Sequence, residues 1–341
     1  MTVPGPSPYD SDLPITLASW RTFCADQPPA PLLADHLLTG KDVRWDDPRL
    51  RYHGPLVMVK TPAIQDIIRL VQQQLRSNMG RRGSRYGLVL DGPSATGKTT
   101  MLQQAGRTHE RMLRRIYPDD TDSIPVIYIS VPSQVAKGRG ASTIAEALCF
   151  FLGLPPTGDL AEIKTRLYHV MSKARTQLVL IDEIHNLRGA ADINQISDYI
   201  KDFAELLPVT FVHAGLDAWK IITSGSRGAQ AAKRYCCYRT QPFNRGTTEE
   251  KSAWLQVVAT FDNALRLHNH QPEDLLPLAP YLHQRTKGYI GTLSQLISQA
   301  AQEAITNSTE KITEDLLGTI LLDGQAENLD YGDEDCPDKA A

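Results

Sequence analysis

The segment Gly92–Thr99 constrains the fold of this chain more than any other. It reads GPSATGKT and matches in full the pattern GxxxxGK followed by Ser or Thr. In this pattern the glycines let the backbone curl so that successive N–H groups point at phosphate oxygens, and the next helix adds the positive end of its dipole. An ordinary glycine-rich turn between a strand and a helix is the alternative interpretation.

The residues on either side favour phosphate binding. The apolar run Tyr86–Asp91 predicts a short strand, and Thr99 to about Ile116 predicts a helix, which is the context that the motif requires. We expect Lys98 to reach the terminal phosphates of ATP and Thr99 to hold Mg²⁺. The whole set expected to bind the nucleotide is Gly92, Pro93, Ser94, Ala95, Thr96, Gly97, Lys98, Thr99 and Thr100.

A second motif follows some eighty residues later. The run Leu178–Ile181 predicts a buried strand, and Asp182 and Glu183 come directly after it. An aspartate at this place is expected to hold Mg²⁺ together with Thr99, and the adjacent Glu183 to orient and deprotonate the attacking water. Two solvated acids at the end of a core strand are the alternative. Such a water activator also argues against a small-molecule kinase.

Strands and helices alternate over the middle of the chain. Further strands are expected at Val126–Val131 and Val209–His213, with helices at Ser142–Leu152, Asp159–Ala174 and about 193–207. Alternation at these lengths predicts an α/β fold, a P-loop NTPase whose parallel sheet is covered by helices on both faces. After about residue 243 only helical patterns occur, including one with Thr292 as its expected N-cap, so a small all-helical domain is expected to follow.

Three further residues are candidates for supporting roles. His213 ends an expected strand where a polar residue could sense the γ-phosphate; a histidine satisfied locally by the turn is equally compatible. Arg234 and Arg239 precede the helical domain, and one of them could act as an arginine finger in a neighbour's site, or both could be solvated. We favour Arg234.

Charge is unevenly distributed along the chain. The net charge is −3, but residues 323–341 alone carry −6, which leaves a mildly basic body of +3. Between Arg76 and Arg115 there are nine Lys or Arg against two acids, for which a solvated helix face is the default. Lys137 and Arg139 lie between glycines on an expected loop, a setting suited to DNA phosphate contacts but also to a plain surface loop.

Composition bounds the cellular setting. The five cysteines show no paired spacing and no CxxC motif, which favours a reduced, cytoplasmic location. There is no signal-peptide pattern at the N-terminus and no run of eighteen apolar residues, so no membrane partner is expected.

The order of these motifs resembles that of the AAA+ ATPases of the TniB/TnsC type, target-selection ATPases of transposons related to the MuB protein. The resemblance covers roughly residues 54–320. Besides the phosphate loop, it rests on Leu180–Leu187 (LIDEIHNL), on Leu207–Ala218 (LPVTFVHAGLDA), similar to the family's sensor strand, and on Thr286–Leu293 (TKGYIGTL), similar to its lid helix. His213 stands where that sensor strand is usually aliphatic, and the lid segment lacks the arginine that many AAA+ proteins use as a second sensor.

The resemblance implies a slow, DNA- or partner-stimulated ATPase. It implies assembly into a homo-oligomeric ring or filament around duplex DNA, engagement of a transposase, and a loop with Lys137 and Arg139 that faces the DNA. A replication-initiator or helicase-loader ATPase is one alternative, and an ATP-dependent signalling switch that binds proteins rather than DNA is another.

The expected domains follow from these motifs. They are a flexible N-terminus (1–12), an N-terminal arm without an assigned role (13–58), a nucleotide-binding α/β domain (59–246), a helical lid (247–322) and an acidic, disordered tail (323–341).

Overall fold

The computed structural model describes residues 13–25, 30, 48–54, 61–81, 83, 85–133, 135, 140–189, 200–201, 205, 207, 209–225 and 228–322. The chain divides into two compact units. Unit 1 comprises Met1–Gln27 and Lys60–Gln241, and unit 2 comprises Pro28–Val59 and Pro242–Ala341.

Unit 1 is an α/β unit. Its strands are β1 (Gly87–Asp91), β2 (Val126–Ser130), β3 (Leu178–Asp182), β4 (Thr210–Gly215) and β5 (Tyr235–Arg239). Its helices are α1 (Leu17–Cys24), α3 (Pro62–Asn78), α4 (Lys98–Ile116), α5 (Gly140–Leu152), α6 (Leu160–Lys173), the 3-10 helix η2 (Ile184–Gly189), α8 (Ala218–Thr223) and α9 (Gly228–Arg234).

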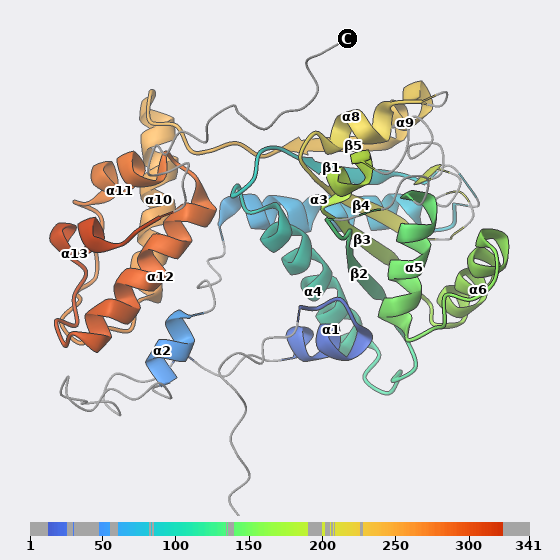
Figure 1. Ribbon diagram of the computed structural model, residues 1–341, viewed down its shortest axis with the longest axis horizontal. Helices are drawn as coiled ribbons and strands as arrows, with labels where there is room; N and C mark the ends of the chain where they lie inside the picture. Colours follow the sequence, from blue (N-terminus) through green and yellow to red (C-terminus); the bar gives the residue numbers. More distant parts are fainter. Residues whose placement is uncertain are drawn as a thin grey trace, which may run out of the picture. The chain divides into compact units, whose positions relative to one another are not determined.

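Among the described residues the strands form one parallel sheet in the order β2-β3-β4-β1-β5. Figure 1 shows α4 on one side of the strands and α5 on the other. Strand β4 separates β1, which leads into the phosphate loop, from β3, which ends at Asp182. Because the strands are parallel, the carboxyl ends of β1, β3 and β4 lie along the same side of the sheet, which we call the carboxyl edge. The side formed by the amino ends of the strands is the amino edge.

Burial explains which strands the sequence revealed. Every residue of β3 and β4 is buried, as apolar runs covered by helices on both faces should be. Strand β5 (YCCYR) is the outermost strand next to β1, and the sequence did not predict it. Within this strand only Tyr235 is buried, and the strand carries no run of aliphatic residues. The helix expected at about 193–207 lies mostly outside the described residues.

Helix ends in unit 1 follow the capping signals. In the sequence, Thr61-Pro62 predicts an N-cap followed by the first helical residue, and Asp159-x-x-Glu162 predicts a capping box. Both are confirmed: Thr61 caps α3 by accepting a hydrogen bond from the N–H of Ile64, and Asp159 forms a capping box with Glu162 at α6. At the N-terminal helix α1, Trp20 is fully buried and stacks on Tyr128 of β2 with ring centroids 5.9 Å apart. A side chain at Gly106 of α4 would come within 2.8 Å of the Trp20 ring, so this glycine lets α1 pack closely.

Unit 2 is helical in its described part. It contains α2 (Pro48–His53), α10 (Thr248–Ala264), α11 (Ala279–Thr286), α12 (Ile290–Thr306) and α13 (Glu314–Thr319), packed around the fully buried Trp254. The expectation that Thr292 caps a helix is wrong: the N-cap of α12 is Tyr289, three residues earlier, and Thr292 is buried inside the helix. The apolar face of this helix extends to Ile290, which a start at Thr292 would leave out.

The expected N-terminal arm at 13–58 is divided between the units. Helix α1 belongs to unit 1, whereas α2 belongs to unit 2 and packs on α12. There the buried Arg49 pairs with Glu310 at 2.8 Å, donating to both of its carboxylate oxygens. Residues 1–12 and 323–341 lie outside the described residues.

Two expectations concern the setting of the chain. None of the helices in the described part has the length and apolar character that crossing a bilayer requires. The four described cysteines, Cys24, Cys149, Cys236 and Cys237, are free thiols.

Candidate functional site

The phosphate loop lies between β1 and α4, at the carboxyl edge of the sheet. Three of its residues have positive φ angles, Gly92 (153°), Ala95 (58°) and Gly97 (84°), which gives the curled backbone that the glycine pattern predicts. A side chain at Gly92 would come within 2.3 Å of the Thr240 carbonyl oxygen. Gly97 is the N-cap of α4, and no side chain caps the helix, so its first N–H groups are left for a ligand such as a phosphate.

Lys98 is held inside this loop. Its side chain is buried, and Nζ donates a hydrogen bond to the Pro93 carbonyl oxygen at 2.6 Å. Burial lowers the pKa of Lys98, and the nearby carboxylates of Glu183, Asp182 and Asp91 oppose this effect. The ammonium group therefore lies near the carboxylates at the ends of β1 and β3, inside the loop that is expected to hold the phosphates.

The end of β5 supports the loop from the other side. The hydroxyl groups of Thr96 and Thr240 are 2.7 Å apart and form a hydrogen bond. The Thr240 N–H also donates to the carbonyl oxygen of Asp91, the last residue of β1. The sequence analysis did not find this contact because it missed β5.

Asp182 is the last residue of β3 and is almost fully buried. One of its oxygens, Oδ1, accepts a hydrogen bond from the Glu183 N–H at 2.9 Å. The other, Oδ2, accepts one from the Tyr128 hydroxyl at 3.0 Å. Burial, followed by the charge of Asp182, raises the pKa of Tyr128, so the phenol stays protonated and keeps donating.

Tyr128 is a residue of this site that the sequence analysis missed. In β2 it lies two residues before Ser130, which pairs with Asp182 across the strands. Side chains two residues apart in a strand share a face, so Tyr128 and Asp182 belong to one face of the sheet. The order of the strands would have revealed this contact, but one sequence does not give that order.

Glu183 follows with a backbone conformation that is uncommon for a non-glycine residue. Its φ is 55°, in the left-handed region. The side chain is partly exposed, and Oε2 lies 3.3 Å from His185 Nε2 in η2. The sequence analysis quoted His185 within its motif without giving it a role.

His185 joins Glu183 to the end of β4. Its Nδ1 accepts a hydrogen bond from the N–H of Leu216 at 3.4 Å, which leaves Nε2 as the ring nitrogen that faces Glu183. Gly215 makes room for this contact, because a side chain there would come within 3.2 Å of Nδ1. The candidate water activator is thereby connected to the strand between β1 and β3.

His213 lies elsewhere than expected. Strand β4 continues to Gly215, so the predicted strand end at His213 was two residues too early. The imidazole is fully buried and stacks on Phe211 with ring centroids 5.9 Å apart, and burial lowers its pKa to about 3. The alternative, a histidine satisfied locally by the turn, is also not what the structure shows, because His213 lies within β4 and neither ring nitrogen has a hydrogen-bond partner among the described residues.

The two candidate finger residues lie at opposite ends of β5. In the register of β1 and β5, Arg239 lies opposite Asp91, next to the phosphate loop. Arg234 precedes Tyr235, which lies opposite Gly87 at the other end of the strand. Arg234 therefore lies at the amino edge, roughly 13 Å from the carboxyl edge. It forms a 3.0 Å ion pair with Glu205. Arg234 lies away from the phosphate loop of its own chain.

Two other regions bear on the expectations. Lys137 and Arg139 lie outside the described residues. In unit 2, Arg285 and Lys287 are the basic residues that could substitute for the second-sensor arginine missing from the lid segment. Arg285 of α11 donates to the carbonyl oxygens of Leu317 and Ile320, and Lys287 is the C-cap of that helix with φ 49°.

Comparison with known proteins identifies the family. A model of the family described as "Bacterial TniB protein" matches residues 49–245, more than half of the chain. The chain belongs to the TniB family. No curated protein sequence matches this TniB protein.

Solved structures confirm the fold. The Orc1 protein of Aeropyrum pernix, in complex with DNA, is 17% identical with a TM-score of 0.55, and the match covers 82% of this TniB protein and 69% of that chain. The ORC2 protein of Aeropyrum pernix, in its ADPNP-ADP complexes, is 11% identical with a TM-score of 0.55, and the match covers 74% and 65% of the two chains. At these identities the likeness shows the fold alone, that of an AAA+ P-loop NTPase with a parallel sheet, flanking helices and C-terminal helices.

Proposed function

We propose that this TniB protein binds ATP with Mg²⁺, hydrolyses it slowly, and assembles as a homo-oligomer on duplex DNA, where it engages a transposase. The observation that carries the proposal is the position of Asp182 and Glu183. Asp182 is the last residue of β3 and Glu183 follows it, at the carboxyl edge where the phosphate loop also lies. One strand, β4, separates β3 from the strand β1 that leads into the loop. A cytoplasmic location is part of the proposal.

The donors at this edge fit a magnesium ion. Thr99 offers an exposed hydroxyl in the first turn of α4, and Asp182 offers a carboxylate fixed by two hydrogen bonds. These are the hard oxygen ligands that Mg²⁺ prefers, alongside phosphate oxygens and water. The ion would neutralise charge on the β- and γ-phosphates.

The protein's own residues supply the rest of the hydrolysis step. The N–H groups at the start of α4 and the Lys98 ammonium bind the phosphate oxygens. Glu183 accepts a proton from the attacking water, and the contact with His185 Nε2 at 3.3 Å holds that carboxylate in place. Arg234 completes the site of a neighbouring subunit as its arginine finger, which makes hydrolysis depend on assembly.

The family and the placement of Arg234 support assembly on DNA. The TniB family is the one whose resemblance implied transposition. A finger residue at the edge away from its own phosphate loop needs a second copy of the chain. Lys137 and Arg139 are the proposed DNA contacts, and Glu183, Lys98 and Arg234 are the proposed catalytic residues. The role of His213 as a sensor receives no support from its buried position.

The test combines ATP hydrolysis with assembly on DNA. ATP and duplex DNA together should produce oligomers in sedimentation and electron microscopy, and DNA should stimulate phosphate release. Lys137→Glu should weaken DNA binding while sparing nucleotide affinity, and Glu303→Gln, an exposed residue of α12, serves as the control. A chain that stays monomeric with ATP and DNA, at an unchanged rate of hydrolysis, would contradict assembly on DNA.

A second candidate function is that of a replication initiator or helicase loader, and the fold likeness to the Orc1 protein of Aeropyrum pernix in complex with DNA is the observation that favours it. That function predicts ATP-dependent binding restricted to particular DNA sequences. Equal binding to unrelated duplexes of the same length would favour the transposition regulator. ATP binding without any response to DNA would favour the signalling switch.

A further inference from the structure

The C-terminal end of α4, opposite the end that follows the phosphate loop, lines an open pocket rich in arginine. The pocket has a volume of about 520 Å³. It is lined by Arg21, Cys24 and Ala25 from α1 and the residue after it, by Glu110, Arg111, Arg114 and Arg115 from α4, and by Pro118 and Thr121 from the following loop. We call it the arginine pocket. It lies at the far end of the helix whose first turn begins at Lys98, and so apart from the nucleotide site.

One of the four arginines has a structural role that explains its presence. Arg114 pairs with the buried Glu110 at 2.9 Å and donates to the carbonyl oxygens of Asp120 and Ser123. It therefore fixes the loop after α4, as cations at a helix C-terminus commonly do. The Glu110 carboxylate is balanced by this partner and does not repel an anion.

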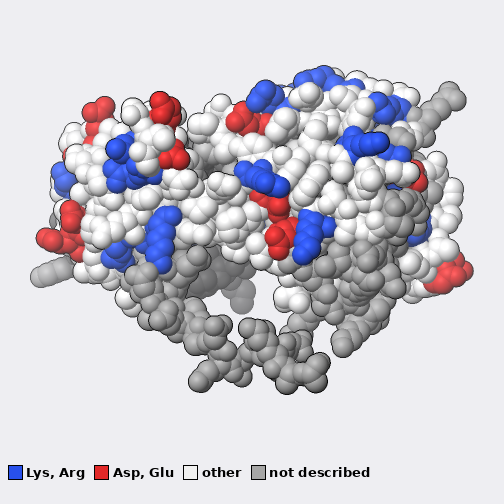
Figure 2. Space-filling view, turned by 90° about the horizontal axis from the view of Figure 1, so that it is seen from above, with Lys and Arg blue, Asp and Glu red and all other residues white. Residues whose placement is uncertain are grey.

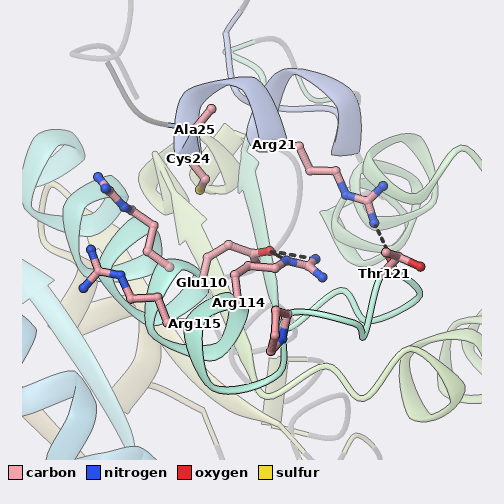
Figure 3. Close-up of a pocket in the computed structure, with 9 residues that line it drawn as sticks. Arg21, Cys24, Ala25, Glu110, Arg114, Arg115 and Thr121 are labelled. Atoms are coloured by element: carbon pink, nitrogen blue, oxygen red, sulfur yellow. Dashed lines mark hydrogen bonds and ion pairs between the residues drawn. The ribbon is translucent and has the colours of Figure 1, made fainter. Parts of the chain in front are cut away.

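Three further arginines on two helices line the pocket. Arg111 and Arg115 are four residues apart on α4, a rise of about 6 Å, so their side chains lie on the same face of the helix. Arg21 reaches from α1 and donates to the Thr121 carbonyl oxygen at 3.2 Å. In Figure 3, Arg115 and Arg21 lie on opposite sides of the Glu110–Arg114 pair.

The other ionisable group of the pocket does not oppose an anion. Burial, together with the nearby Glu110, raises the pKa of the Cys24 thiol to about 12, so Cys24 stays neutral. The face in Figure 2 differs from this pocket, because Lys and Arg are spread there with Asp and Glu among them. Guanidinium groups donate in a fork that matches phosphate oxygens, which favours phosphate over a single carboxylate.

We propose that the arginine pocket binds a row of phosphate groups, with Arg21, Arg111 and Arg115 as the donors. Two sources offer this chemistry, the backbone of duplex DNA and free inorganic polyphosphate. The DNA source rests on the function proposed above, and the polyphosphate source does not.

The test uses the full chain, its phosphate loop saturated with Mg²⁺ and ADP. Tripolyphosphate and a duplex DNA are titrated separately against the wild type and the double variant Arg111→Gln/Arg115→Gln. The control is Arg69→Gln/Arg76→Gln, which removes the same charge from two exposed positions of α3. If the double variant melts early, Arg115→Gln alone replaces it, because Arg115 is exposed.

The double variant should bind each occupant about tenfold more weakly than the wild type. For DNA, a plot of log affinity against log salt concentration should become less steep. The slope should change in magnitude by about two, because each of the two lost phosphate contacts contributes roughly 0.9 to it. The control should bind like the wild type. Binding of tripolyphosphate without DNA binding would support the pocket and overturn the DNA part of the proposed function.

Three results would overturn the pocket assignment. One is equal loss of binding in the double variant and the control, which indicates general attraction of charge. Another is unchanged binding of both occupants by the double variant. The third is displacement of tripolyphosphate by polyglutamate of equal charge, which would show that phosphate is not what the arginines recognise.

Discussion

The two ends of α4 both carry basic side chains, but they are built differently. At the N-terminus, Gly97 leaves the first N–H groups uncapped and Lys98 is the only basic side chain of the first turn. At the C-terminus the main chain offers carbonyl oxygens, and the positive charge comes from arginine side chains of α4 and α1. The first end depends on backbone geometry, whereas the second depends on which helices pack together.

The difference determines how each end responds to substitution. The phosphate loop cannot accept a side chain at Gly92 without moving Thr240. The exposed Arg115, in contrast, can change without disturbing the core. Substitutions near the phosphate loop should therefore change ATP binding or hydrolysis, whereas those inside the sheet should change stability.

The largest of these effects is expected at the N-terminal end of α4. Lys98→Ala should weaken ATP binding about 100-fold, because a charge-assisted hydrogen bond to phosphate contributes up to about 3 kcal/mol. Isothermal titration with ATP measures this, with Arg69→Gln as the control. Equal affinity in wild type and Lys98→Ala would show that the loop does not bind the phosphates.

His213, inside the sheet between the two edges, should affect stability more than hydrolysis. Its folded-state pKa of about 3 lies below the ordinary value of 6.5, so the unfolded chain takes up a proton first as pH falls. The free energy of unfolding should therefore drop by about 2 kcal/mol between pH 8 and pH 5 from this residue alone.

Urea unfolding of wild type and His213→Phe at both pH values checks this. The substitution should remove that part of the pH dependence and leave ATP hydrolysis at pH 8 close to the wild-type rate. A large loss of hydrolysis with no change in pH dependence would restore the sensor interpretation.

Tyr128 lies between α1 and the acidic end of β3, since its ring stacks on Trp20 and its hydroxyl donates to Asp182. Tyr128→Phe should lower the rate of hydrolysis five- to tenfold, about 1 kcal/mol for one hydrogen bond, and raise the Mg²⁺ concentration needed for half-maximal nucleotide binding. The exposed Tyr117→Phe is the matched control. An unchanged Mg²⁺ requirement would limit Tyr128 to packing.

The smallest effect is expected at His185. His185→Ala should lower kcat about threefold and leave KM unchanged, because a partly exposed contact between His185 and Glu183 contributes up to roughly 1 kcal/mol. His169→Ala, at an exposed position of α6, is the control. A change in KM alone would place His185 in nucleotide binding and not in orienting Glu183.

The sequence predicts the backbone-built end of α4 well. The apolar run of β1, the glycines and the helix after them lie next to one another, so one local pattern specifies the loop. The acidic end of β3 is readable for the same reason, as are the caps Thr61 and Asp159.

Contacts between distant segments were not predictable in this way. Tyr128 meets Asp182, and Arg21 meets the loop after α4, only because the sheet order and the packing of α1 bring them together. Strand β5 escaped notice because an exposed edge strand needs no apolar run. The Thr292 cap was wrong because a buried apolar face extended the helix past a polar signal.

The most direct test of the central claim compares single-turnover ATP hydrolysis by wild type and Glu183→Gln, with ATP affinity measured on the same samples. Removal of a general base lowers a rate roughly 10²–10⁴-fold without removing contacts to the phosphates. We predict a loss of that size with ATP affinity unchanged. Equal rates in the two proteins would contradict the assignment of Glu183, and with it the account of this edge of the sheet as a site of ATP hydrolysis.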